Sequence, residues 1–153
     1  MNIILLLVCI ILCELAGASG AIFTVKSVST WYKKLKKPSI NPPSWVFGPM
    51  WTLLFALMGV SLYLVINSRV SFFSGEIFIF AVQFVFNILW SILFFGMKRP
   101  GYAFIELLFL WSFILETIIV FYPTSHLAAY LLIPYILWVS FAGVLNFLIW
   151  KLN

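Results

Sequence analysis

Charge is the scarcest property of this chain. Only 8% of its 153 residues are Asp, Glu, Lys or Arg, and all four acidic residues are glutamates. A water-soluble domain carries roughly 25% charged residues, because its surface must face water. With 65% hydrophobic residues, the chain has too few polar groups to cover a globule of this size. The composition therefore excludes a soluble protein and predicts an integral membrane protein.

Side chains that bind metals or act as nucleophiles are also scarce. The single histidine is His126, and the two cysteines, Cys9 and Cys13, lie within the first apolar run. Their spacing suits one helical face but not an ordinary disulfide, and two thiols are too few for a zinc site. Motifs for haem attachment, a Ser-His-Asp set in the bundle and a Gly-rich phosphate loop are all missing. We expect no metal and no cofactor, and we interpret the cysteines as small packing residues.

Long apolar runs make up most of the chain. They cover residues 3–25, 45–66, 75–95, 102–122 and 127–150, and polar or Pro/Gly breaks separate them. About 20 apolar residues cross a bilayer as a helix, whereas an isolated strand cannot satisfy its backbone there. Residues 16–18 resemble a signal-peptide cleavage site, but no basic segment precedes the first run. The prediction is a single all-α domain over residues 1–153, a five-transmembrane-helix bundle with a long, basic, Pro-rich loop at 26–44.

Basic residues lie almost entirely on one side of these predicted spans. One side holds the basic residues of the first loop, the third loop and the C-terminus, whereas Arg69 is alone on the other. By the positive-inside rule, the first loop and the C-terminus are cytoplasmic and the N-terminus is outside. No basic surface module lies outside the spans, so we expect no nucleic-acid partner.

Polar groups within the third run follow a helical spacing. Gln83, Asn87, Trp90 and Phe94 are separated by four, three and four residues and so share one face of a helix. One interpretation is a cavity wall with two amides that orient a ligand and two rings that stack on it. The other is hydrogen bonding between helices, since amides hold membrane helices together. The spacing alone does not separate the two.

Aromatic residues make up 20% of the chain. Trp51 and Phe55 share a face of the second predicted helix, and Trp138 shares one of the fifth with the small residue Ala142. Three aromatic faces that converge would suit a flat, mostly apolar ligand, and rings that face lipid are the alternative. Glu14, Glu106 and Glu116 also fall within spans, but three scattered acids are weak support for a proton relay.

One long segment carries a family resemblance. It reads Trp31-Tyr32-x-x-Leu35-x-Lys37-Pro38-Ser39-x-x-Pro42-Pro43-x-Trp45-Val46-Phe47-Gly48-Pro49-x-Trp51-Thr52. Further blocks follow in order, including Asn87-x-x-Trp90, Pro134-Tyr135-x-x-Trp138 and Phe141-Ala142-x-x-Leu145-Asn146. The chain closely resembles the translocator protein family, also called tryptophan-rich sensory protein or peripheral benzodiazepine receptor (TspO/MBR), from about Gly17 onward.

The resemblance implies a five-helix bundle, commonly dimeric, with a pocket at the end that carries the long first loop. Members bind porphyrins such as protoporphyrin IX, and several bind sterols and isoquinoline or benzodiazepine drugs. Tryptophans matching Trp51 and Trp138 are implicated in light-dependent porphyrin breakdown in some bacterial members, and Glu106 stands where relatives often have Asp. The implied pocket residues are Tyr32, Pro42, Phe47, Trp51, Phe55, Asn87, Trp90, Phe94, Leu107, Trp138, Ala142 and Leu145.

Two departures from the family pattern bear on the ligand. The proposed sterol motif requires a Tyr between Leu145 and Lys151, and this chain has Phe147 there, so the motif gives no support for cholesterol binding. Ile40 also replaces a Trp that many relatives carry in the Pro-rich loop, which is expected to alter the lid of the pocket.

These observations lead to a preferred function and two alternatives. The preferred function is a membrane receptor or sensor that sequesters a porphyrin or another flat apolar molecule, with the propionates attracted by lysines of the first loop. The alternatives are a light-dependent porphyrin-degrading enzyme that uses Trp51 and Trp138, and a transporter of porphyrin or lipid. We expect a homodimer in a prokaryotic cytoplasmic membrane, with the mitochondrial outer membrane as the alternative.

Overall fold

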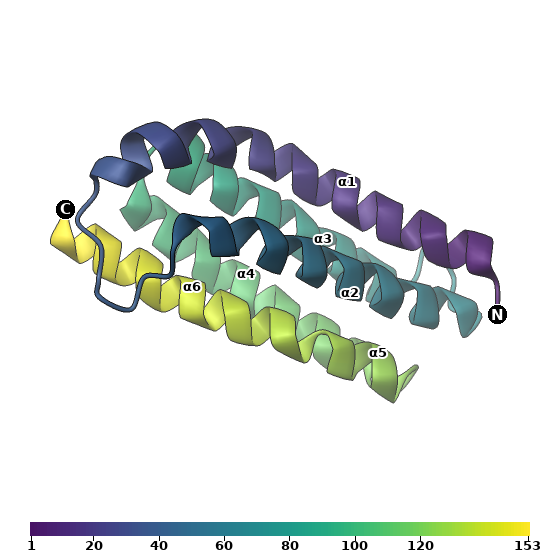
Figure 1. The fold of residues 1–153 in the computed structure, drawn as a ribbon. Helices are drawn as coiled ribbons and strands as arrows, with labels where there is room; N and C mark the ends of the chain where they lie inside the picture. The colour runs from purple at the N-terminus through teal and green to yellow at the C-terminus, as the bar shows by residue number, and fades with distance from the viewer.

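The five apolar runs form five long helical segments in the computed structural model, which describes residues 1–153 (Figure 1). The first comprises α1 (Ile3–Ser27) and the π-helical turn η1 (Val28–Tyr32), and the second comprises the 3-10 turn η2 (Ser44–Val46) and α2 (Phe47–Asn67). The third comprises α3 (Gly75–Ser91) and the π-helical turn η3 (Ile92–Gly96), and the fourth is α4 (Pro100–Phe121). The fifth is divided into α5 (His126–Leu131) and α6 (Ile133–Leu152). The predicted all-α bundle of five membrane-spanning helices is confirmed.

Short polar residues mark where several of these helices begin. The side chains of Asn2, Ser74 and Ser125 each accept a hydrogen bond from a backbone N–H in the first turn of α1, α3 and α5. Such caps satisfy donors that have no partner within the helix. Proline opens α4 and α6, where the missing N–H costs nothing. The break at Leu132 therefore follows from Pro134 at the start of α6.

The first segment is longer than the sequence analysis predicted. The expected span ended at residue 25, whereas the helix continues through η1 to Tyr32. No Gly or Pro lies between Lys26 and Tyr32, so no helix-breaking residue stops the helix at the first lysine. The hydroxyl of Ser27 donates a buried hydrogen bond of 2.6 Å to the carbonyl of Phe95, which joins the end of α1 to the π-helical turn η3. The first loop is correspondingly shorter than the predicted 26–44.

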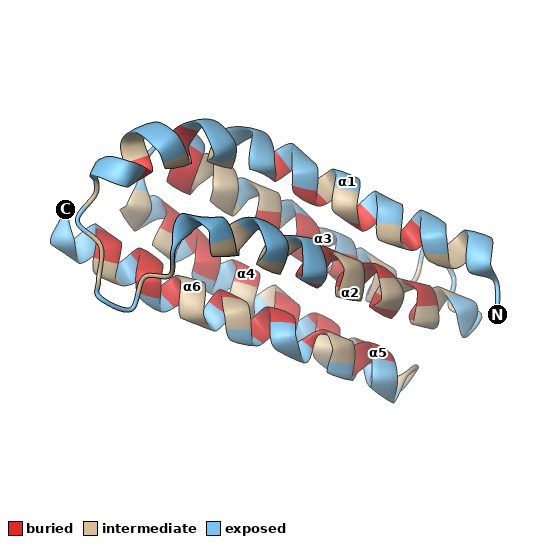
Figure 2. Cartoon of the chain, in the orientation of Figure 1, coloured by how far each residue is buried: buried red, intermediate tan, exposed pale blue.

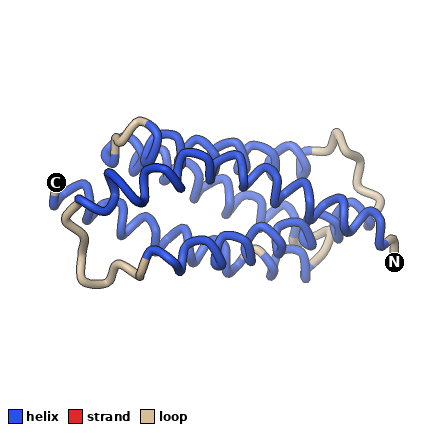
Figure 3. The backbone as a smooth tube through the Cα atoms, turned by 45° about the horizontal axis from the view of Figure 1, so that its top comes forward, coloured by secondary structure: helices blue, strands red, loops and turns tan.

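Neighbouring helices pack in a defined order. α1 packs against α2 and α3, α4 packs against α3 and α6, and α5 packs against α2 and α4. The two termini lie at opposite ends of the bundle, and all connections run around those ends (Figures 1 and 3). Exposed residues lie along the outer faces of the helices, while buried residues face the other helices (Figure 2). Most exposed side chains along the helices are apolar, as expected for surfaces that face lipid.

Basic residues gather at the end of the bundle that holds the C-terminus (Figure 1). The first loop and the C-terminus are joined there, because the backbone N–H of Lys36 donates to Asn153 Oδ1 at 3.1 Å. Asn153 Nδ2 donates in return to the carbonyl of Lys36 at 2.9 Å. Arg69 lies between α2 and α3 at the opposite end. The asymmetry of charge seen in the sequence is therefore an asymmetry between the two ends of the structure.

Candidate functional site: an aromatic cavity between four helices

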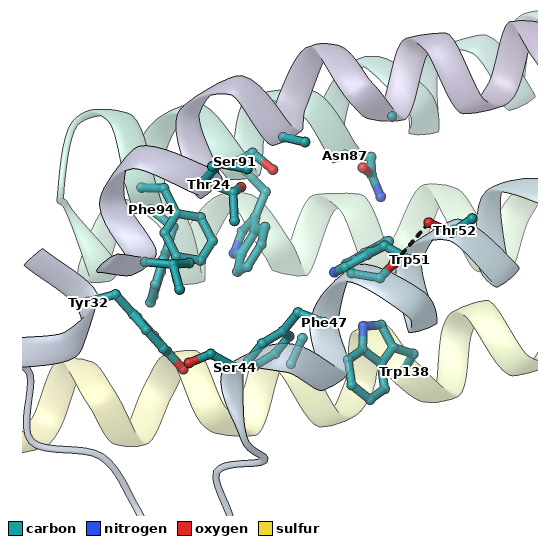
Figure 4. A pocket seen from close by; sticks show the side chains of 18 of the residues that line it. Thr24, Tyr32, Ser44, Phe47, Trp51, Thr52, Asn87, Ser91, Phe94 and Trp138 are labelled. Atoms are coloured by element: carbon teal, nitrogen blue, oxygen red, sulfur yellow. Dashed lines mark hydrogen bonds between the residues drawn. The ribbon is translucent and has the colours of Figure 1, made fainter. Parts of the chain in front are cut away.

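A cavity of about 500 Å³ lies among α1, α2, α3 and α6, toward the end that carries the first loop (Figure 4). α4 contributes no residue to its wall. α2 packs on α5 at one end of the bundle, and toward the first loop α2 and α6 face each other across the cavity. The space is therefore bounded by four helices, with α4 behind α3 and α6.

Stacked aromatic pairs form two walls of the cavity. On α2, the rings of Trp51 and Phe55 stack with centroids 5.5 Å apart and planes 26° from parallel. On the α3 side, Trp90 and Phe94 stack at 5.2 Å and 21°. The ring of Trp138 on α6 meets the ring of Phe47 edge-on at 6.1 Å. Flat rings fixed by such neighbours suit a flat apolar ligand, because stacking and burial of apolar area both favour it.

The end nearest the first loop is closed by Tyr32. Its side chain is 3% exposed, and its hydroxyl donates a hydrogen bond of 2.9 Å to Asn41 Oδ1 in the loop. The edge of Phe47 packs against the Tyr32 ring at 6.4 Å, and the ammonium of Lys37 lies 4.8 Å from the centre of that ring. The loop is thus fastened to the cavity by a residue that itself lines the cavity.

Most polar groups in the wall already have partners. Asn87 Nδ2 donates to the hydroxyl of Tyr135 at 2.7 Å, and Trp90 Nε1 donates to Asn146 Oδ1 at 3.0 Å. Trp138 Nε1 is the fully buried donor of the wall that has no hydrogen-bond partner. A buried donor of this kind is uncommon and costly. It is available to an acceptor atom on a ligand.

Small residues of α1 form the remaining wall. Gly17, Ala18, Ala21 and Thr24 line the cavity, and Ala18 and Ala21 are exposed. Exposed residues at the start of α2, including Thr52, line it from the other side. The cavity therefore opens between α1 and α2, toward the membrane.

Ten of the residues implied by the resemblance line this cavity, namely Tyr32, Phe47, Trp51, Phe55, Asn87, Trp90, Phe94, Trp138, Ala142 and Leu145. Pro42 and Leu107 are not in its wall. Pro42 lies in the first loop, next to Asn41, whose side chain accepts the hydrogen bond from Tyr32. Leu107 lies on α4, where its Cδ2 atom is 3.0 Å from the position that a Cβ on Gly143 would occupy. These two positions belong to the surroundings of the cavity rather than to its surface.

The polar and aromatic residues that share one face of the third run do not all have the same role: some line the cavity and others bond to a neighbouring helix. Asn87, Trp90 and Phe94 line the cavity, whereas Gln83 lies in the core behind it. Gln83 Oε1 accepts a hydrogen bond of 2.8 Å from the hydroxyl of Tyr135 on α6. Asn87 and Trp90 combine both roles, because each faces the cavity while it bonds to another helix.

The three glutamates within spans have separate environments. Glu14 lines the cavity, Glu106 is buried on α4 with both carboxyl oxygens unpartnered, and Glu116 is exposed. They form no cluster. The basic residues of the first loop do not line the cavity either, so Glu14 is its only carboxyl group and no ammonium or guanidinium faces it.

Sequence reasoning missed the contribution of α1. Its glycines and alanines carry no chemical signal, since small residues are common in any membrane helix. The clue that was present is their spacing: Gly17 and Ala21 are four residues apart, and so are Gly20 and Thr24. That spacing forms a strip of little volume facing the aromatic residues of α2 and α3.

The fold and the cavity together define a five-helix integral membrane protein with an internal, ligand-sized aromatic pocket. The chain belongs to the TspO/MBR family, which matches residues 9–151, and the resemblance noted in the sequence is thereby confirmed. It is 42% identical to the tryptophan-rich protein TspO of Chlorobaculum tepidum over 99% of this chain and 98% of that protein. The corresponding protein of Archaeoglobus fulgidus is 40% identical over 100% of this chain and 99% of the relative. The translocator protein of Homo sapiens is 36% identical over 80% of this chain and 75% of the relative.

Proposed function

We propose that this protein is a membrane receptor or sensor that binds a porphyrin such as protoporphyrin IX in the cavity between α1, α2, α3 and α6. The observation that carries the proposal is the set of fixed indole rings around one space, from Trp51 on α2, Trp90 on α3 and Trp138 on α6. Membership of a family whose members include tryptophan-rich sensory proteins supports a sensory role.

The size and chemistry of the cavity suit such a ligand. Ligand pockets usually enclose about 300–1,000 Å³ and are lined mainly by apolar and aromatic side chains. Burial contributes roughly 25 cal/mol for each Å² of apolar surface removed from water, and each aromatic contact adds about 0.5–1.5 kcal/mol. A macrocycle between the two stacked pairs gains both contributions.

The propionates of a porphyrin require a polar exit from this cavity. No lysine lines it, and its only carboxyl group is that of Glu14. Lys37 is a cation at the closed end, with its ammonium 4.8 Å from the centre of the Tyr32 ring. We therefore expect the propionates to point toward Tyr32 and the basic loop, away from Glu14.

The direct test is a titration of the purified full chain in detergent with protoporphyrin IX in the dark, followed by tryptophan fluorescence. Saturable quenching in the micromolar range, weakened in the Trp51→Phe/Trp138→Phe variant, is expected. Quenching that rises linearly without saturation would contradict the proposal.

A second candidate is an enzyme that degrades porphyrin in light. It is favoured by one observation: Trp51 and Trp138 both line the cavity, and the N–H of Trp138 is free to engage a ligand. Light would supply the energy and dioxygen the oxidant. Illumination of the complex in air should then yield a new absorbing product that depends on both tryptophans, whereas a binding protein returns the porphyrin unchanged.

Transport of porphyrin or lipid is a third candidate, which uptake by vesicles would test.

The orientation and setting follow from the charges at the two ends. We propose that the basic end with the C-terminus faces the cytoplasm and the N-terminus faces outward. A prokaryotic cytoplasmic membrane is favoured by the near-complete alignment with the relatives from Chlorobaculum tepidum and Archaeoglobus fulgidus. Accessibility of single cysteines at positions 34 and 69 to a membrane-impermeant reagent tests the orientation. The expected homodimer is tested by the mass of the detergent-solubilised protein.

A further inference from the structure

A second concavity lies outside the aromatic cavity, at the basic end of the bundle. It is a groove of about 340 Å³ between the start of α4 and the end of α6. Its wall includes Lys98, Arg99, Tyr102, Ile105 and Trp150, and none of these residues lines the aromatic cavity. We propose that this groove binds the headgroup of an anionic phospholipid from the leaflet at this end.

The charge of the groove is positive and unopposed. Lys98 and Arg99 are exposed, and the segment from Gly96 to Ile105 contains no acidic residue. The next residue, Glu106, is 6% exposed and faces the interior. A third cation stands close by, because the ammonium of Lys151 lies 4.7 Å from the centre of the Trp150 ring. A phosphate at this position gains attraction from three basic side chains, and no Asp or Glu side chain lines the groove to repel it.

Aromatic residues place the groove at the depth of the headgroups. Tyr102 is 62% exposed and the guanidinium of Arg99 lies 5.9 Å from its ring centre. Trp150 is half-exposed at the end of α6, and Tyr and Trp are concentrated where the membrane meets water. Gly101 allows this indole to come close, since a Cβ there would be 2.9 Å from Trp150 Nε1. The indole of Trp150 belongs to the groove wall, so its N–H is placed to donate to a phosphate or glycerol oxygen.

The outer face of α4 favours a lipid over a soluble anion. Ile105 in the groove wall is exposed, and Leu108 and Phe109 continue the exposed apolar surface along the helix toward the bilayer centre. A headgroup held by Lys98 and Arg99 therefore has an apolar surface directly below it for an acyl chain. A free phosphate would use only the upper half of this arrangement.

The test uses the full chain in phosphatidylcholine bilayers that contain increasing amounts of phosphatidylglycerol with brominated acyl chains. Bromine quenches nearby tryptophan, and the difference between wild type and Trp150→Phe isolates the signal of Trp150. Brominated phosphatidylcholine serves as the reference lipid. We expect phosphatidylglycerol to reach half-maximal quenching of Trp150 at an about 25-fold lower mole fraction than phosphatidylcholine, since Lys98 and Arg99 near an anionic headgroup contribute about fivefold each and the two factors multiply.

Matched variants separate the groove from general attraction by a basic surface. Lys98→Gln/Arg99→Gln should reduce the preference for phosphatidylglycerol to less than about twofold. Lys33→Gln/Lys34→Gln removes the same charge from the same end without touching the groove, and at about 0.15 M salt, where screening acts over roughly 8 Å, the preference should persist. An unchanged preference in the groove variant, or an equal loss in both variants, would overturn the proposal. So would displacement by inorganic phosphate, which would indicate a site for soluble anions.

Discussion

Asn87 on α3 donates a hydrogen bond of 2.7 Å to the hydroxyl of Tyr135 on α6. The same hydroxyl donates to Gln83 one turn away on α3, at 2.8 Å. Tyr135 is 1% exposed, and its ring meets Trp51 edge-on at 6.3 Å. One buried phenol therefore links the wall of the cavity to the core, and it holds two amides of α3 and an indole of α2 in position.

Removal of this hydroxyl should destabilise the bundle. Tyr135→Phe leaves the amide of Asn87 and the carbonyl oxygen of Gln83 without their partner, and each buried unpartnered group costs about 1–3 kcal/mol in soluble proteins. Hydrogen bonds between membrane helices average nearer about 0.6 kcal/mol, so we expect a total loss of about 1–2 kcal/mol. Unfolding followed by circular dichroism in detergent measures it. Tyr102→Phe, at an exposed ring, is the control and should show no loss; equal stability of both variants would contradict the account.

Two glycines beside the cavity should respond in opposite ways to alanine. A Cβ on Gly17 would overlap the ring of Phe55, whereas a Cβ on Gly48 would meet nothing within 4 Å. Gly17→Ala therefore forces α1 away from α2 or moves Phe55 from its stack with Trp51, at a cost of about 1–3 kcal/mol. Gly48→Ala should leave stability unchanged or raise it by about 0.5 kcal/mol. Thermal unfolding of the pair is the measurement, and a harmless Gly17→Ala would show that the contact between α1 and α2 is loose.

The indole N–H of Trp90 has a hydrogen-bond partner and that of Trp138 has none, so replacing each Trp should change stability by a different amount. Trp90→Phe leaves Asn146 Oδ1 without its donor and should lower stability by about 1 kcal/mol. Trp138→Phe removes a buried donor that has no partner, so the loss of the N–H itself should cost nothing in the unliganded protein. Its effect should instead appear in binding, as an about threefold or greater loss of affinity for protoporphyrin IX if the ligand accepts a hydrogen bond there. Stability and titration measured on both variants decide it, and the reverse pattern would contradict the assignment.

The helices were predictable from the sequence because a bilayer imposes a length of apolar chain that few other structures require. The limits of those helices were harder to predict. The first helix continues past Lys26 to Tyr32, since charged residues do not end a helix that lacks Gly and Pro. The last helix breaks at Leu132, since Pro134 removes a donor. At both positions, proline predicted the limit of the helix better than the change in hydropathy did.

The aromatic part of the site was predictable for a similar reason. A spacing of three and four residues places Asn87, Trp90 and Phe94 on one face, and that face does line the cavity. The same spacing included Gln83, which lies one turn deeper, where the space is filled by the core. Periodicity reports the face of a helix but not where along that face the neighbouring helices diverge. The glycine and alanine wall of α1 depends on the same tertiary information.

The central claim is that the space beside Trp138 holds the ligand, and Ala142 tests it most directly. Ala142 lines the cavity, whereas Val144, two residues further along α6, is exposed on the outside of the bundle. Phenylalanine at either position adds the same ring to the same helix, and only Ala142→Phe fills the cavity. The measurement is the dark titration of both variants and wild type with protoporphyrin IX. We predict at least an about tenfold loss of affinity in Ala142→Phe, equivalent to about 1.4 kcal/mol, with wild-type affinity in Val144→Phe. Equal binding by all three proteins would place the porphyrin outside this cavity and contradict the account.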